Sequence, residues 1–267
     1  MTPQACEDID RISGDELALD KRRSSFILRN KFRRLSGDKR LGLLWIVLEP
    51  LIMSLVYLFV LTVLRSSLRP ESIFIGITLW GLVTVSIMSG LGSIDDFTGG
   101  LKCERVRTGV LVKPMIQFRI IDSLSRTSGV ALILLFYFGI PTLGIISFFI
   151  IAVVLGFLCE GLALNMSRLT HAVPDLKIVT RYFLRLMFFA GPILYPLTMA
   201  EGIHYQANLY NPFAYFVELT RDLSGLENGF SNLDSMTATL VTVIISILAV
   251  RGYSQIDKLR WELSSWS

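Results

Sequence analysis

Several ionisable residues lie inside long apolar stretches of the sequence, where charged side chains are costly and usually functional. Glu49 directly precedes Pro50, so that a carboxylate coincides with a predicted helix kink. Arg119, Asp122 and Arg126 follow the i, i+3, i+7 spacing of one helix face. This spacing predicts an ion pair between Asp122 and Arg126 within the helix.

A further carboxylate, Glu160, is predicted to lie at about the depth of Arg126 in the next helix. Pro141 and Thr142 predict a tight turn that makes the two helices antiparallel neighbours. We therefore expect a contact between Glu160 and Arg126. The intramembrane polar residues Glu49, Arg126 and Glu160 fit a structural brace or a proton relay, and the brace is favoured because such charges commonly pair with one another.

The elements that position these residues are long apolar segments. Hydrophobic residues make up 52% of the 267 residues, charged residues only 18%, and the mean hydropathy is +0.56. A run of about 18 or more apolar residues is long enough to cross a bilayer as a helix. We expect an all-α integral membrane protein with six spans, at residues 41–64, 73–94, 120–140, 143–166, 182–199 and 236–250.

The distribution of Lys and Arg predicts the orientation, because positive charge concentrates in cytoplasmic loops. Under alternating topology, 23 of the 26 Lys and Arg residues fall on one side, which includes both termini. We expect a cytoplasmic N-terminus at 1–40, a transmembrane domain at 41–252 and a cytoplasmic tail at 253–267, in the inner membrane. The polar first forty residues do not resemble a signal peptide.

Residues 24–36 have the pattern of a basic amphipathic helix. Leu28, Phe32 and Leu35 form an apolar stripe, and Arg29 and Arg33 lie on other faces. Such a helix is typical of a membrane interface with anionic headgroups. The alternative is a plain topology signal, and the interfacial helix is favoured because stripe and charge occur together.

The segment at 95–117 is too long for a hairpin and too charged to enter lipid. A short helix there would present apolar and charged side chains to a cytoplasmic partner, and a solvated loop is the equal alternative. The residues expected to make that contact are Leu101, Glu104, Arg105, Val106, Lys113 and Pro114.

The segment at 200–232 is too apolar for a solvated loop and too interrupted for a span. Asn211 and Pro212 open an amphipathic stretch that includes Glu218 and ends at Arg221. Short re-entrant helices fit this pattern, because irregular backbone at membrane depth must be covered by protein or water.

A series of short motifs follows in a fixed order over about residues 28–250. They are Leu41-Gly42-Leu43-Leu44-Trp45, Leu48-Glu49-Pro50, Lys113-Pro114, Val173-Pro174-Asp175-Leu176, Pro192-Ile193-Leu194-Tyr195-Pro196, Asn211-Pro212 and Val217-Glu218-Leu219-Thr220-Arg221. In order and spacing they resemble the membrane subunit of ABC type-2 exporters, in particular the capsule and O-antigen polysaccharide export permeases. The chain departs from the family pattern at Asn30-Lys31, usually a Glu-containing run, and at Glu160, usually small or apolar.

The resemblance implies a transport subunit, not an enzyme, that moves a polysaccharide, often lipid-linked, through a conduit between two copies of the chain. A separate P-loop ATPase would dock on the cytoplasmic loops, with 95–117 as the coupling segment, and would hold the ATP and magnesium. The sequence contains no G-x-x-x-x-G-K-[ST], which agrees with an ATPase on another polypeptide. The other expected partners are the polysaccharide or glycolipid and membrane lipid, and no nucleic acid.

Aromatic residues of the fifth predicted span are candidates for the substrate conduit. Phe183, Phe188, Phe189 and Tyr195 could stack against sugar rings, although for any single ring helix packing is the favoured interpretation.

The sequence leaves other functions open beside polysaccharide export. They are export of a drug, lipid or teichoic-acid-like polymer and, less favoured, a membrane-embedded glycosyl- or acyltransferase. The adjacent pair Asp95-Asp96 has no His or second acidic cluster nearby in the same loop to complete a catalytic site. No metal site is expected, because His171 and His204 are predicted on opposite sides of the membrane.

Overall fold

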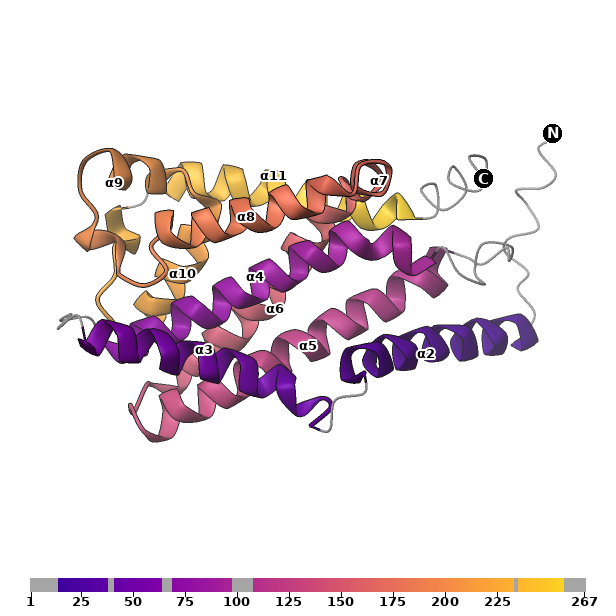
Figure 1. Cartoon of the computed structure of the whole chain (residues 1–267), viewed down its shortest axis with the longest axis horizontal. Coiled ribbons are helices and arrows are strands. Elements are labelled where there is room, and N and C mark those ends of the chain that lie inside the picture. The colour runs from indigo at the N-terminus through magenta and orange to yellow at the C-terminus, as the bar shows by residue number, and fades with distance from the viewer. Residues whose placement is uncertain (1–13, 38–40, 64–68, 98–107, 233–234, 257–267) are drawn as a thin grey trace.

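The computed structural model describes residues 14–37, 41–63, 69–97, 108–232 and 235–256, and every regular element in these ranges is helical (Figure 1). The all-α prediction is therefore confirmed for this part of the chain. The α-helices are α2 Gly14–Ser36, α3 Leu44–Val63, α4 Pro70–Phe97, α5 Thr108–Phe136, α6 Thr142–Leu164, α7 Ser167–Ala172, α8 Asp175–Ala190, α9 Gly202–Leu209, α10 Pro212–Leu223 and α11 Ser235–Ser254. Two 3₁₀ helices, η3 Leu197–Met199 and η4 Phe230–Asn232, lie beside α9 and α10 in sequence.

Helices α4 and α6 form the centre of the bundle. Residues 72–80 of α4 are all buried, and α6 buries Phe148, Ala152 and Leu155 almost completely. Both helices are apolar around most of their circumference, which is the pattern of a helix enclosed by others. In Figure 1, α9 and α10 lie at one end of the bundle and α2 and α7 at the other.

Three helices in the described part of the chain are long and apolar enough to cross a membrane: α3, α4 over Pro70–Ile94, and α6. The other expected spans are less apolar or shorter. The apolar part of α5 carries Arg119, Asp122 and Arg126, and α8 has only 16 residues. The apolar stretch of α11 whose side chains the structure describes is Thr239–Ser254.

Two helices differ in extent from the spans predicted for them. Helix α5 begins at Thr108 rather than near residue 120, so Lys113 and Pro114 lie inside a helix instead of closing a loop. Helix α8 runs over Asp175–Ala190 rather than 182–199. It stops there because Gly191 is extended and Pro192 follows it, and a residue before proline is disfavoured in the α conformation.

Small residues bring α6 and α11 into close contact. A Cβ atom on Gly161 would lie only 2.7 Å from the backbone oxygen of Ala249, and one on Gly252 would meet the carbonyl of Gly161. Close helix approach of this kind is the usual role of small residues in membrane helices.

Helix α2 contains the helix predicted at 24–36 and packs along α5 (Figure 1). Ile27 joins a buried cluster with Leu111 and Met115, and the ring of Phe32 lies 5.0 Å from that of Phe118. Part of the apolar side of α2 is therefore covered by protein.

Candidate functional site

A network of mostly buried charges connects α3, α5 and α6, and Arg119 of α5 lies at its centre. Its Nε and Nη2 atoms donate to the two carboxylate oxygens of Glu160 on α6, both at 3.0 Å. Its Nη1 atom donates to Asp122 at 3.0 Å. The side chains of Arg119, Asp122 and Glu160 are each at most 1% exposed, so the bidentate ion pair between Arg119 and Glu160 is shielded from solvent.

The network continues to α3 through Arg126. Its Nε atom donates to Asp122 at 3.0 Å, which confirms the predicted pair, and its Nη1 atom donates to Glu49 at 2.9 Å. The Glu49 side chain is 58% exposed, unlike the other members. The charge network therefore extends from the exposed Glu49 side chain to the buried pair of Arg119 and Glu160.

The predicted contact between Glu160 and Arg126 is wrong, because Glu160 pairs with Arg119 instead. Arg119 lies 17 residues before the end of α5 and Glu160 lies 18 residues after the start of α6, so the two are level in an antiparallel pair. Arg126 lies only 10 residues before the end of α5. Counting residues from the Pro141 turn would have identified the correct arginine.

Two more donors complete the surroundings of Glu160, and neither is predicted from the sequence. The hydroxyl of Ser89 on α4 lies 3.0 Å from Oε1, and that of Tyr253 on α11 lies 3.1 Å from Oε2. Glu160 thus connects α4, α5, α6 and α11. This arrangement has the features of a structural brace, because each carboxylate oxygen has its own donors.

A pocket of about 340 Å³ opens next to Glu49, between α3, α4, α5 and α8. Of the predicted conduit residues, Phe188 and Phe189 line it, and Phe188 lies 5.0 Å from the ring of Tyr57. Phe183 is exposed and outside the pocket lining. Tyr195 is also outside it, and its hydroxyl lies 2.9 Å from Nε2 of His204.

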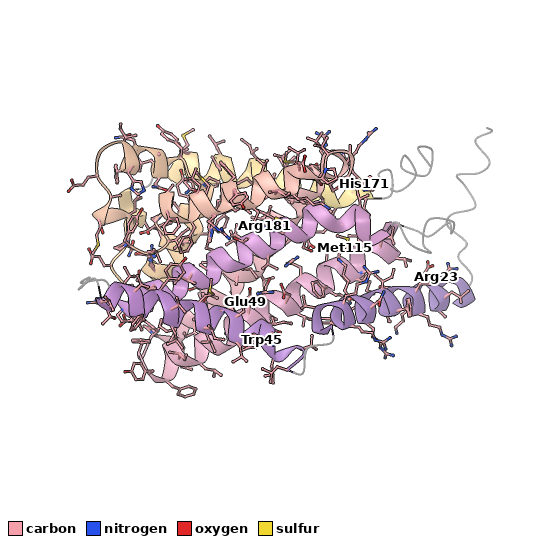
Figure 2. All side chains as sticks on the ribbon, viewed as in Figure 1. Arg23, Trp45, Glu49, Met115, His171 and Arg181 are labelled. Carbon is pink, nitrogen blue, oxygen red and sulfur yellow. The ribbon has the colours of Figure 1, made fainter. Side chains whose placement is uncertain are left out.

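Arginines of two helices also line this pocket. They are Arg126 of α5 and Arg181 and Arg185 of α8, and Figure 2 shows Arg181 on α8 together with Glu49 on α3. The guanidinium of Arg185 lies 5.8 Å from the ring centre of Tyr182. The pocket thus combines aromatic walls with positive charge.

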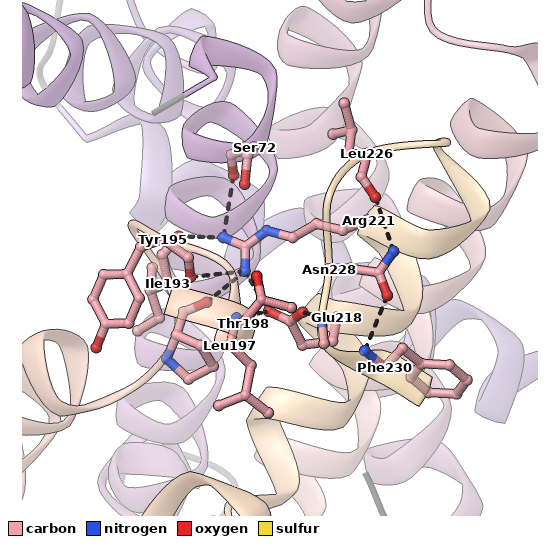
Figure 3. Close-up of polar contacts among 12 residues, drawn as sticks. Ser72, Ile193, Tyr195, Leu197, Thr198, Glu218, Arg221, Leu226, Asn228 and Phe230 are labelled. Carbon is pink, nitrogen blue, oxygen red and sulfur yellow. Dashed lines mark hydrogen bonds and ion pairs between the residues drawn. The ribbon is translucent and has the colours of Figure 1, made fainter. Parts of the chain in front are cut away.

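A second buried ion pair fixes the segment between α8 and α11. Arg221 of α10 is fully buried and donates to the carbonyl oxygens of Pro192 at 2.7 Å, Ile193 at 2.7 Å and Tyr195 at 3.2 Å (Figure 3). It also donates to Glu218 at 2.6 Å. These contacts satisfy backbone oxygens that the interruption of α8 leaves without helical partners.

Glu218 and Asn211 hold the rest of this segment. Glu218 accepts hydrogen bonds from the backbone amides of Leu197 at 3.2 Å and Gly229 at 2.5 Å. The Asn211 side chain caps the start of α10 by accepting from the amide of Phe213 at 3.1 Å, with Pro212 at the first helical position. The four predicted residues of the segment, Asn211, Pro212, Glu218 and Arg221, therefore all have structural contacts.

The remaining predicted sites are only partly described. Leu101, Glu104, Arg105 and Val106 of the expected coupling segment lie outside the described residues. Within α5, Lys113 is exposed and Pro114 is buried. On α2, Arg29 and Arg33 are exposed.

The chain is similar to several curated export proteins, although no protein family model matches it. The O-antigen export system permease protein RfbA of Myxococcus xanthus is 27% identical over 169 residues, which are 60% of this chain and 63% of that protein. The RfbA permease of Klebsiella pneumoniae is 27% identical over 84% of this chain and 86% of its own length. The polysialic acid transport protein KpsM of Escherichia coli is 25% identical over 80% and 87%.

The predicted resemblance to polysaccharide export permeases is confirmed. The chain covers less than two thirds of the first of these relatives but most of the other two. These permease relatives and the apolar helices together indicate an integral membrane protein.

Proposed function

We propose that this chain is the membrane-spanning permease subunit of an ATP-driven ABC exporter that carries a polysaccharide, in lipid-linked form, across the cytoplasmic membrane. The observation that carries the proposal is the similarity to two kinds of polysaccharide export protein over at least 80% of the chain. A drug or lipid exporter would not be expected to resemble both.

The proposed architecture has six spans, α3, α4, α5, α6, α8 and α11, with both termini in the cytoplasm. The charges of α5 fit this arrangement because Arg119, Asp122 and Arg126 are paired inside the bundle. Helices α9 and α10 would form the re-entrant segment, which is supported by the backbone contacts of the buried Arg221. Helix α2 would lie at the inner interface with Arg29 and Arg33 toward lipid headgroups.

The proposed conduit is the pocket beside α3 and α8, completed by a second copy of the chain. The rings of Tyr57, Trp80, Phe188 and Phe189 line it within one copy. Aromatic rings provide flat apolar faces against which sugar rings can pack. ATP binding and hydrolysis would occur on a separate P-loop subunit that contacts the cytoplasmic side, including the start of α5 with Lys113 and the segment before it.

The test combines purification and complementation. The tagged full chain is expressed with the P-loop ATPase encoded nearest to it, and we expect the two to copurify and ATP hydrolysis to rise with lipid-linked polysaccharide. The pair should also restore surface polysaccharide in a strain that lacks its own export permease. Normal membrane levels without surface polysaccharide or an associated ATPase would refute the proposal.

A further inference from the structure

The pocket beside α3 and α8 has chemically different ends. From the start of α8, Arg181 and Arg185 precede Phe188 and Phe189, and from the start of α3, Glu49 precedes Tyr57. In the view of Figure 1, α4 lies between α3 and α8, and the latter two helices run in the same direction. The charged residues of the pocket therefore gather at one end and the rings at the other. Arg126 joins the charged end through its bond with Glu49.

The positive charges at this end are not balanced within the described residues. Arg126 is matched by Asp122 and Glu49. No ion pair joins Arg181 or Arg185 to a carboxylate in the described ranges, and the guanidinium of Arg185 lies over the ring of Tyr182. The pocket therefore presents two guanidinium groups without an acidic partner from the part of the chain that the structure describes.

The depth of these arginines makes the lack of an acidic partner among the described residues significant. At 1.5 Å per residue, Arg181 and Arg185 lie about 9 Å and about 15 Å along α8 from Asp175. If α8 starts at the inner interface, Arg185 is then near the middle of a hydrocarbon layer of about 30 Å. An arginine at that depth needs water or an anion, and both side chains are exposed toward the pocket.

We infer that Arg181 and Arg185 form an anion subsite for the phosphate or diphosphate group of an amphipathic ligand. Two guanidinium groups match the double charge of such a group and form paired hydrogen bonds with its oxygens. The apolar part of the ligand extends out of the pocket between α3 and α8. The outer faces of these helices expose Val56, Phe59 and Leu186. The inference rests on the proposed function and assigns the residues that select and position its substrate.

The test measures binding to the full permease with its ATPase, in nanodiscs of phosphatidylcholine. The probes are farnesyl diphosphate, farnesol and inorganic diphosphate. We expect farnesyl diphosphate to bind about tenfold or more tightly than farnesol, because each charged hydrogen bond removed typically weakens binding by that order. The variant R181Q/R185Q should lose this preference, and R181K/R185K should keep part of it.

Arg251→Gln is the matched control, because it removes one charge from an exposed position at the end of α11, away from the pocket. Unchanged binding of farnesyl diphosphate by R181Q/R185Q would overturn the inference. So would inorganic diphosphate binding as tightly as the amphipath, which would indicate a free anion as the ligand. Dissociation of two permease copies in R181Q/R185Q with unchanged binding would assign the arginines to a subunit contact instead.

The two proposals fail in different ways. If the proposed function is wrong, the wild-type chain restores no surface polysaccharide and associates with no ATPase. If only the anion subsite is wrong, R181Q/R185Q exports polysaccharide at the wild-type rate and at wild-type membrane levels.

Discussion

The buried pair of Arg119 and Glu160 shows how strongly the bundle depends on single residues. Each side chain is at most 1% exposed, so removal of one leaves an uncompensated charge in the core. Loss of one partner of a buried ion pair typically costs about 3–5 kcal/mol, whereas replacing both by apolar residues of similar size is often neutral.

We therefore predict that Arg119→Met and Glu160→Met each lower the thermal stability of the purified protein strongly, by about 3 kcal/mol or more. The double variant should regain most of that stability. The measurement is a double-mutant cycle by thermal unfolding in detergent. The same cycle with Arg126→Met in place of Arg119→Met should show much weaker coupling to Glu160, because Arg126 bonds to Asp122 and Glu49. Equal coupling of the two arginines would contradict the structure.

Arg221 makes a second prediction at the residue scale. Its guanidinium reaches four backbone carbonyls, including that of Ser72, and Glu218 at once. A lysine ammonium has neither the width nor the number of donors to do so. Arg221→Lys should cost about 2–4 kcal/mol, since hydrogen bonds to charged groups contribute about 1.5–3 kcal/mol each.

Thermal unfolding and limited proteolysis together check the Arg221 prediction. The variant should unfold at lower temperature and be cleaved faster within residues 191–201, the segment that Arg221 holds. Arg251→Lys, at an exposed position, serves as the control and should behave as the wild type. A variant at position 221 with the same cleavage rate as the control would show that the carbonyl contacts do not fix this segment.

At the scale of elements, the packing of α6 on α11 depends on the absence of side chains. Gly161→Ala would place a methyl group 2.7 Å from the backbone of Ala249, and backbone cannot rotate out of the way. We expect a loss of about 1–3 kcal/mol, the usual cost of overpacking.

Gly92→Ala is the matched control for the packing of α6 on α11. Gly92 lies in α4 and a Cβ atom there has open space, so alanine should be neutral or stabilise the helix by up to about 1 kcal/mol. Both variants are compared by thermal unfolding. If Gly161→Ala is as stable as Gly92→Ala, the two helices are farther apart than described.

At the scale of the whole molecule, the six-span topology predicts which positions are accessible from each side of the membrane. Asp175 at the start of α8 should be accessible from the cytoplasmic side of the membrane. Ile203 of α9, which is 89% exposed, should be accessible from the opposite side. In a background without native cysteines, Ile203→Cys should react with an impermeant maleimide in intact spheroplasts.

Asp175→Cys should react with the same maleimide only in inverted vesicles. A third variant, Cys in place of the buried Leu155, should react in neither preparation. Labelling of positions 175 and 203 from the same side would rule out the six-span arrangement and with it the proposed depth of Arg185.

The helical content and the order of the helices could be predicted from sequence, because both follow from local properties. Runs of apolar residues predict α3, α4 and α6 directly, and the i, i+4 spacing of Asp122 and Arg126 was enough to predict their ion pair. Asn211-Pro212 likewise predicts the start of α10, because capping depends on neighbouring residues.

Contacts between helices were decided by the tertiary structure. Whether Glu160 meets Arg119 or Arg126 depends on the length of α5 and the register of two antiparallel helices, and Ser89 and Tyr253 approach it from helices far away in sequence. The pocket of Arg181, Arg185 and Glu49 likewise exists only where α3 and α8 meet, since residues more than 130 positions apart share no sequence signal that would place them together.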